Sequence, residues 1–120
     1  MPAITVEDII KAHDLVTKET ADDTRMISEA GLHEMVFLAC RIEDPHRQAA
    51  CILFSVCAYP PFRDGNKRTA IMIADDILSA AGLCRKAGDG EIFELMRGVA
   101  TFTVEQDDIE TWLREHTAGK

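Results

Sequence analysis

Apolar side chains recur every three or four residues along most of the chain, and this spacing constrains the fold more than any other feature. Leu32, Met35, Val36 and Ala39 fall at positions i, i+3, i+4 and i+7, which places them on one face of a helix. Only the stretch 83–85 suggests a short extended piece. The pattern therefore predicts an all-α fold, a compact bundle of about six helices.

Length and composition agree with one soluble domain spanning residues 1–120. Apolar residues make up 47% of the chain and charged residues 28%, as is usual for globular proteins, and no linker or repeat divides it. The most apolar stretch, Ala49 to Ala58, is too short for a membrane span of about 20 residues. Since no secretory signal pattern begins the sequence, we expect a cytoplasmic protein without a membrane partner.

Capping residues and helix breakers predict the ends of the helices in the first half of the chain. Thr5 and Asp8 form a capping-box pattern, and Asp44 followed by Pro45 marks the start of a third helix. The third helix is expected to end before Tyr59 and, being apolar nearly all round, to lie at the centre of the bundle. The polar stretch 18–25 is expected to be a loop. The expected core stripe of the first helix is Val6, Ile9, Ile10, Leu15 and Val16.

Three further helical patterns follow in the second half. One runs from about Lys67 to Ala81 and closes at Gly82, and the next runs from Gly90 to about Ala100. The last is expected to be capped by Thr103, with Gln106 completing a capping box. The expected core residues of the first and last of these helices are Ala70, Ile73, Ala74, Ile77, Leu78, Ile109, Trp112 and Leu113.

The distribution of charge narrows the classes of partner. A formal net charge of −8 argues against a nucleic-acid-coating role. Arg63, Lys67 and Arg68 nevertheless crowd into six residues, and such a small basic site suits a compact anionic ligand. The remaining acidic pairs are expected to be solvated faces: Asp22-Asp23, Asp75-Asp76 and Asp107-Asp108.

The cysteines show no spacing typical of a zinc site or a disulfide framework. Three of the four lie in apolar periodic segments, where a free cysteine behaves as a small hydrophobic residue. We therefore expect buried, reduced thiols at Cys40, Cys51, Cys57 and Cys84.

The segment YPPFRDGNKRTA, residues 59–70, carries the chemistry. Its glycine, Gly65, lets the backbone bend toward a ligand, and Asn66 can cap the following helix or donate to an anion. Lys67 and Arg68 supply charge at a helix N-terminus, where phosphate binds readily. Asp64 is a candidate Mg²⁺ ligand. From the spacing alone, an ordinary turn with a solvated basic rim fits equally well.

The same segment resembles the Fic/Doc (Fido) family and specifically its death-on-curing, or Doc-like, branch. The signature His-x-Phe-x-Asp/Glu-Gly-Asn-Lys/Gly-Arg is matched from the phenylalanine onward, and the stretches 5–14 and 28–32 also look like that branch. The resemblance implies a Fido-type fold, Mg²⁺ with ATP as cofactor, a cognate antitoxin and a translation-factor target. The expected nucleotide- or phosphate-binding residues are Phe62, Arg63, Gly65, Asn66, Lys67 and Arg68, with Asp64 holding the metal.

One departure from the signature decides the expected activity: Pro60 stands where the family has the histidine that acts as general base. Proline has no titratable group, and the loss of a general base lowers the reaction rate by a factor of about 10²–10⁴. Tyr59 is a poor substitute because its ordinary pKa is about 10. His13, on the first helix, could enter the site from another element, although a lone helical histidine is more often structural or solvated.

Three functions stay open at this point. The first is a phosphate- or nucleotide-binding protein impaired in transfer, and the second is an active phosphotransferase or nucleotidyltransferase toxin in which Lys67 and Arg68 stabilise the transition-state charge. The third is a protein-interaction module that binds no nucleotide. The stretch 111–116 partly resembles the family's inhibitory motif, but a charged surface helix is the favoured interpretation.

Overall fold

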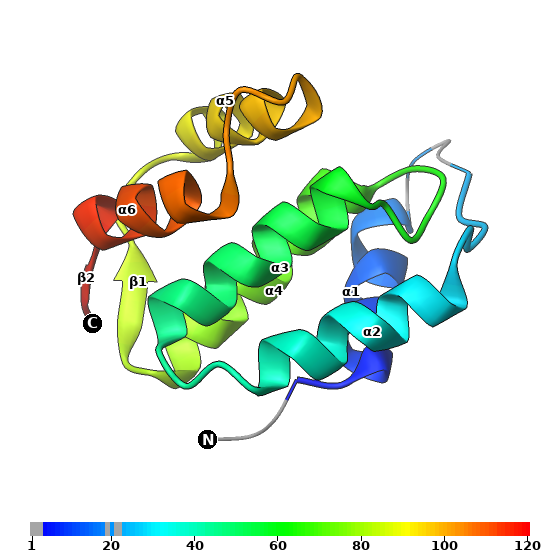
Figure 1. The fold of residues 1–120 in the computed structure, drawn as a ribbon, viewed down its shortest axis with the longest axis horizontal. Coiled ribbons are helices and arrows are strands. Elements are labelled where there is room, and N and C mark those ends of the chain that lie inside the picture. Colours follow the sequence, from blue (N-terminus) through cyan, green and yellow to red (C-terminus); the bar gives the residue numbers. More distant parts are fainter. Residues whose placement is uncertain (1–3, 19, 21–22) are drawn as a thin grey trace.

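The computed structural model describes residues 4–18, 20 and 23–120. Within these residues the chain forms six helices and one two-stranded ribbon (Figure 1), which confirms the all-α fold. In chain order the elements are α1 (Val6–Thr17), α2 (Glu29–Cys40), α3 (Pro45–Ala58), α4 (Asn66–Ala80), β1 (Leu83–Arg85), α5 (Asp89–Ala100), α6 (Gln106–His116) and β2 (Thr117–Gly119).

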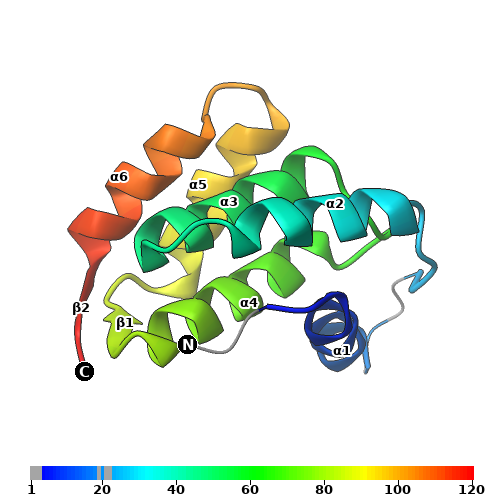
Figure 2. The same ribbon diagram turned by 60° about the horizontal axis from the view of Figure 1, so that its bottom comes forward.

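The central element is α3, as its apolar character predicts. It contacts α2, α4, α5 and α6, and its Ile52, Leu53 and Val56 are fully buried. The side chain of Asp44 accepts hydrogen bonds from the first backbone N–H groups of α3, so the predicted start is confirmed. Figure 2 shows α2, α3 and α4 running side by side, with α6 against α3 on the other side.

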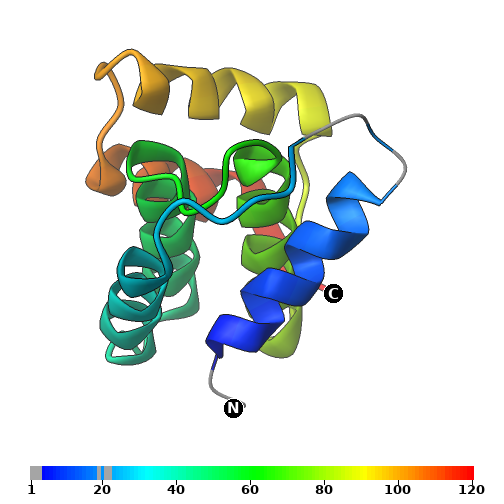
Figure 3. The ribbon, with the colours of Figure 1, turned by 90° about the vertical axis from the view of Figure 1, so that its right-hand side faces the viewer.

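Two elements complete the surroundings of α4. The first, α1, packs along α4, and α5 lies across the region where α3 ends and α4 begins (Figure 3). The expected capping box of α1 is present, because Thr5 and Asp8 bond to each other's backbone N–H groups. This packing brings the end of α3, the start of α4 and parts of α1 and α5 together at one end of the bundle.

The core stripe of α1 is narrower than predicted. Ile9 is fully buried, whereas Leu15 is 62% exposed, so the prediction for Leu15 is wrong. Leu15 follows Ile9 by six positions, and at about 100° per residue it lies roughly 120° away from the buried face. The prediction that 18–25 is a loop concerns residues that lie partly outside the described part of the chain.

The cap of α6 differs from the prediction. Glu105 is the capping residue and forms a capping box with Asp108, so Thr103 and Gln106 do not cap this helix. The hydroxyl of Thr103 instead donates to the carbonyl of Gly98, where the chain turns back at the end of α5. The fold also leaves Trp112 only partly buried at the edge of the core, stacked on His116.

The burial predicted for the cysteines is confirmed only in part. All four thiols are free. Cys51 is buried, but Cys40, at the last position of α2, is exposed, and Cys57 and Cys84 are half-buried. A helical position is buried only if it faces a neighbour, and the end of α2 faces solvent at Cys40.

The predicted extended piece at Leu83–Arg85 is confirmed, and the structure adds its partner. It pairs antiparallel with Thr117–Gly119, in the register Leu83 with Gly119 and Arg85 with Thr117. None of the helices among the described residues has the length and apolar character needed to span a bilayer.

The backbone at Phe102 generates a stability prediction. This residue has a φ of 62°, in the left-handed region, while its side chain is 90% exposed. A non-glycine residue in that region destabilises the folded chain by roughly 1–2 kcal/mol. Glycine removes this strain, but its greater conformational freedom in the unfolded chain offsets part of the gain in stability. We expect Phe102→Gly to raise the free energy of unfolding by about 0.5 kcal/mol, measured by thermal or urea denaturation.

Gly82→Ala is the matched control for this prediction. Gly82 has a φ of 78°, and no atom lies within 4 Å of the Cβ it would acquire. The substitution is therefore expected to destabilise the protein through the backbone alone, by about 1 kcal/mol. Equal stability of the Phe102→Gly variant and the natural protein would contradict the assignment of strain to Phe102.

Candidate functional site

The loop that joins α3 to α4 ends in an uncapped helix. Gly65, which precedes α4, has a φ of 81° and a ψ of 10°, and no side chain caps the first turn. The first backbone N–H groups of any helix lack partners within the helix, and they carry the positive end of its dipole. The start of α4 is therefore an electropositive backbone surface, as the sequence predicts for residues 65–68.

Asn66 shapes this loop from inside. Its side-chain amide nitrogen donates to the carbonyl of Phe62 at 2.8 Å, and its amide oxygen accepts from the N–H of the same residue at 3.2 Å. Of the two roles expected for Asn66, capping of α4 is therefore wrong, because its side chain folds back to close the turn; donation to an anion stays a prediction. The hydroxyl of Thr69, which donates to the carbonyl of Gly65, holds the turn from the other side.

A second set of hydrogen bonds joins the loop to the segment before α2. The N–H groups of Ile27 and Ser28 donate to the carbonyl of Pro61, and the N–H of Arg63 donates to the carbonyl of Arg25. Residues 61–63 are thus fixed along residues 25–28, which come from a distant part of the sequence.

Asp22 lies outside the described residues. Asp23 belongs to the same cluster, and its side chain remains partly exposed while it makes these contacts. Its backbone N–H donates to Oδ2 of Asp64 at 2.9 Å, and its carboxylate lies 3.9 Å from the guanidinium of Arg63. Hydrogen bonds from the Arg25 side chain and backbone lower the pKa of Asp23 to about 2. Asp23 therefore stays ionised at neutral pH and offsets part of the positive charge of Arg25 and Arg63.

These elements surround a cavity of about 400 Å³. Most of the predicted site residues line it, together with two residues that the sequence analysis did not single out. The lining residues are Cys57, Pro60, Arg63, Asp64, Gly65, Asn66, Lys67, Arg68 and Phe93. Among the described residues, three basic residues and one acidic residue line the cavity, so its charge favours an anion.

Phe62 is the predicted site residue that the structure does not bring to the cavity. It is only 2% exposed, and its ring stacks on the imidazole of His13, with centroids 3.7 Å apart and planes inclined by 7°. His13 is itself 1% exposed and does not line the cavity. The structural interpretation of His13 is confirmed, although His13 also reaches the loop from another element.

The donor set at Asp64 is compatible with a metal ion that a ligand helps to hold. One carboxylate oxygen accepts the N–H of Asp23, and the other has no hydrogen-bond partner among the described residues. The described part of the chain contains no group of three metal-ligating side chains. A Mg²⁺ ion bound here would need phosphate oxygens and water to complete its coordination, which is how protein-bound Mg²⁺ is usually held with nucleotides. The residues present fit that arrangement.

Asp75 and Asp76 lie away from this cavity, as expected from their position along α4. The Asp75 side chain forms an ion pair with Arg85 at 3.0 Å and stays 40% exposed, and Asp76 is exposed, which agrees with the predicted solvated face. Asp107 and Asp108 are exposed, as predicted, and Asp108 also takes part in the cap of α6.

The C-terminal stretch 111–116 lies on α6, which packs at the start of α3, whereas the loop follows the end of α3. Its Arg114 pairs with Asp44 at 2.8 Å and with Glu110 at 2.9 Å. The interpretation of this stretch as a charged surface helix is confirmed.

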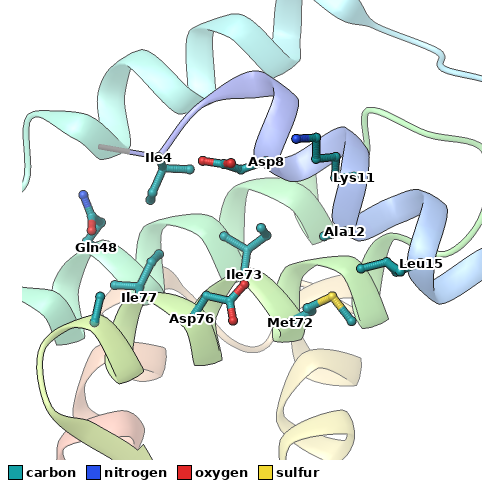
Figure 4. A pocket seen from close by; sticks show the side chains of 11 residues that line it. Ile4, Asp8, Lys11, Ala12, Leu15, Gln48, Met72, Ile73, Asp76 and Ile77 are labelled. Atoms are coloured by element: carbon teal, nitrogen blue, oxygen red, sulfur yellow. The ribbon is translucent and has the colours of Figure 1, made fainter. Parts of the chain in front are cut away.

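A second cavity, of about 300 Å³, lies between α1 and α4 (Figure 4). None of residues 59–70 lines this second cavity. Apolar side chains such as Ile4 and Met72 line it, with Asp8 and Asp76 among the polar ones. Burial, assisted by the charges of Asp75 and Asp8, raises the pKa of Asp76 above its ordinary value. Two acidic residues against one basic residue, Lys11, make this cavity a poorer site for an anion than the first.

Cys57 on α3 and Phe93 on α5 line the first cavity, the one at the loop between α3 and α4. No sequence pattern predicts either of them as a site residue. Burial raises the pKa of the Cys57 thiol to about 11, although the charge of Lys67 opposes the shift. The thiol is therefore protonated at neutral pH, and a thiol is a much weaker nucleophile than a thiolate.

This pKa predicts the order in which the cysteines react. At pH 8 we expect iodoacetamide to modify the exposed Cys40 well before Cys57, as followed by mass spectrometry of the peptides. In concentrated urea the two should react at similar rates, because unfolding removes the burial that raises the pKa. Equal rates in the folded protein would contradict the assigned burial of Cys57.

Comparison with known protein families shows which family the chain matches. The model of the Fic/DOC family matches residues 3–78, and no curated protein matches the chain. The matched stretch contains α1, α2, α3, the loop and most of α4, whereas α5 and α6 follow it. Since the match covers well over half of the chain, this protein belongs to the Fic/DOC family.

Proposed function

We propose that this protein is a Doc-like member of the family whose loop binds the phosphate groups of a nucleotide, and that it is impaired in phosphoryl transfer or lacks it. The observation that carries the proposal is the uncapped start of α4, which opens into a cavity lined by Arg63, Lys67 and Arg68. In the Doc-like branch that the motif resembles, the partners are a cognate antitoxin and a translation factor, and we extend both to this proposal.

Phosphate binding follows from two features of the cavity. Backbone N–H groups at a helix start bind anionic oxygens, and the helix dipole favours negative charge there. Arg68 lines the cavity as well, and its Nη1 donates to the carbonyl of Val16 at 2.8 Å. Lys67 contributes a second cation on the same turn, and Arg63 a third from the loop.

Asp64 is the proposed Mg²⁺ ligand, through the carboxylate oxygen that Asp23 leaves unused. When bound, the ion would neutralise part of the charge on the phosphate groups. Asp64 would then hold the ion and Arg63 would bind phosphate oxygens, which fits a Mg²⁺–ATP complex better than free ATP.

Impaired transfer is inferred from the groups that line the cavity. Pro60 lies in its wall, at the position where the family signature has the general base. No histidine lines the cavity among the described residues, and the Cys57 thiol has a pKa of about 11. Tyr59 is 72% exposed and lines a different, smaller depression. With Asp64 assigned to the metal ion, a bound target hydroxyl would lack a residue suited to take its proton at neutral pH.

An active transferase is the second candidate, because Lys67 and Arg68 both line the cavity. Phosphoryl transfer depends mainly on positioning and on neutralising charge, so a slow reaction without the base is chemically reasonable. The two candidates share the same nucleotide site and differ only in whether transfer occurs.

Nucleotide binding is tested by calorimetry with Mg²⁺–ATP. We expect Lys67→Ala to weaken binding about tenfold, which corresponds to about 1.4 kcal/mol. Lys11→Ala removes the same charge from an exposed position on α1 and is expected to leave the affinity unchanged. If the natural protein binds no Mg²⁺–ATP, the nucleotide proposal is wrong and a protein-interaction role takes its place.

Transfer is tested in cell lysate with γ-labelled and α-labelled ATP. We expect Pro60→His to label a protein from γ-labelled ATP and the natural protein to label little or none, because an imidazole at that position faces the cavity. Tyr59→His is the matched control, since it places the same group one residue away and outside the cavity. Equal labelling by the natural protein would favour the active transferase, and labelling from α-labelled ATP would indicate nucleotidyl transfer.

A further inference from the structure

His13 connects α1 to the loop through a hydrogen bond. Its Nε2 lies 2.8 Å from the carbonyl oxygen of Asp64, a residue 51 positions away in the sequence. A carbonyl oxygen only accepts hydrogen bonds, so Nε2 must carry the proton and donate. The imidazole therefore fixes the orientation of the peptide group that joins Asp64 to Gly65.

The same ring holds the loop at a second point. It stacks face to face on Phe62, with the centroids 3.7 Å apart. Phe62 and Asp64 flank Arg63, so one buried side chain contacts the loop on both sides of a residue that lines the cavity. A phenylalanine at this position would keep the stacking and lose the donor, whereas a glutamine would keep a donor and lose the ring.

Gly65 shows how closely α1 and the loop fit. A Cβ at this glycine would lie 2.7 Å from Cγ2 of Thr17 and 3.4 Å from Nε2 of His13. The hydroxyl of Thr17 in turn donates to the carbonyl of His13, so these two residues form one wall. The left-handed glycine, and with it the start of α4, therefore rests directly against this face of α1.

We propose that His13 is a positioning residue for the nucleotide site. By fixing the carbonyl of Asp64 and the ring of Phe62, it sets the direction of the Asp64 carboxylate and the start of α4. The N–H of Asp23 fixes the Asp64 side chain from the opposite side. The inference rests on the proposed function, because it assigns His13 a part in binding Mg²⁺–ATP without contact to the ligand.

The test compares His13→Phe and His13→Gln with His33→Phe, a control at an exposed histidine on α2. For His13→Phe we expect the Mg²⁺–ATP affinity to fall about tenfold, the range seen when groups behind a metal ligand are removed. Affinity for ATP without Mg²⁺ should fall less, because Asp64 is the group that loses its orientation. His13→Gln should recover part of the affinity, and His33→Phe should bind like the natural protein.

A purely structural role would give a different result. It would lower the melting temperature and leave the affinity for Mg²⁺–ATP and its dependence on Mg²⁺ unchanged in the folded variants. That result, or equal affinity of His13→Phe and the natural protein, would overturn the proposal.

Nuclear magnetic resonance of the ligand-free protein separates this inference from the proposed function. In the natural protein the Nε2–H of His13 should be protected from exchange and should show a nuclear Overhauser contact with Gly65. In His13→Phe the amide signals of residues 62–66 should shift, while those of α6 stay in place. If the natural protein binds no nucleotide, these signals still test the positioning of the loop, and their absence would overturn it even if the variants fail to fold.

Discussion

The burial of α3 is the constraint on which the rest of the structure depends. It is apolar nearly all round, so it must be covered on several sides, and α2, α4, α5 and α6 supply that cover. With α3 fixed at the centre, the loop after Tyr59 must leave from one end of the bundle and return along α4. Because α5 crosses this end and α1 packs along α4, the loop is enclosed by elements that are far apart in the sequence.

The site follows from this arrangement. Its cations lie on the loop and on the first turn of α4, but their setting comes from other segments: Asp23 holds Asp64, His13 and Thr17 support the turn, and Phe93 closes the cavity. The basic cavity sits on a chain whose net charge is −8. The proposed binding of a small anion therefore depends on this local cluster of basic residues and not on the net charge of the chain.

Features that depend on neighbouring residues in the sequence could be predicted. Some of these predictions failed where two local patterns competed. The capping boxes at Thr5 and at Glu105 obey the same spacing rule, yet the one proposed at Thr103 is absent because its hydroxyl bonds to Gly98. Both patterns satisfy the rule, and only the path of the turn after α5 selects between them. Asn66 is a similar case, since the side-chain amide of an asparagine at this position can either cap the helix or close the turn, and the structure shows the second.

The sequence by itself determined the helices, the central place of α3, the cluster of basic residues and the proline at position 60, because each of these is encoded within a few consecutive residues. Only the tertiary structure decided that Phe62 turns away from the cavity, that Cys57 and Phe93 line it, and that His13 and Asp23 hold Asp64 from two sides. Asp23 and His13 are 41 and 51 positions from Asp64. Contacts over such separations form when apolar faces pack, and periodicity says which face of a helix is buried without saying which partner covers it.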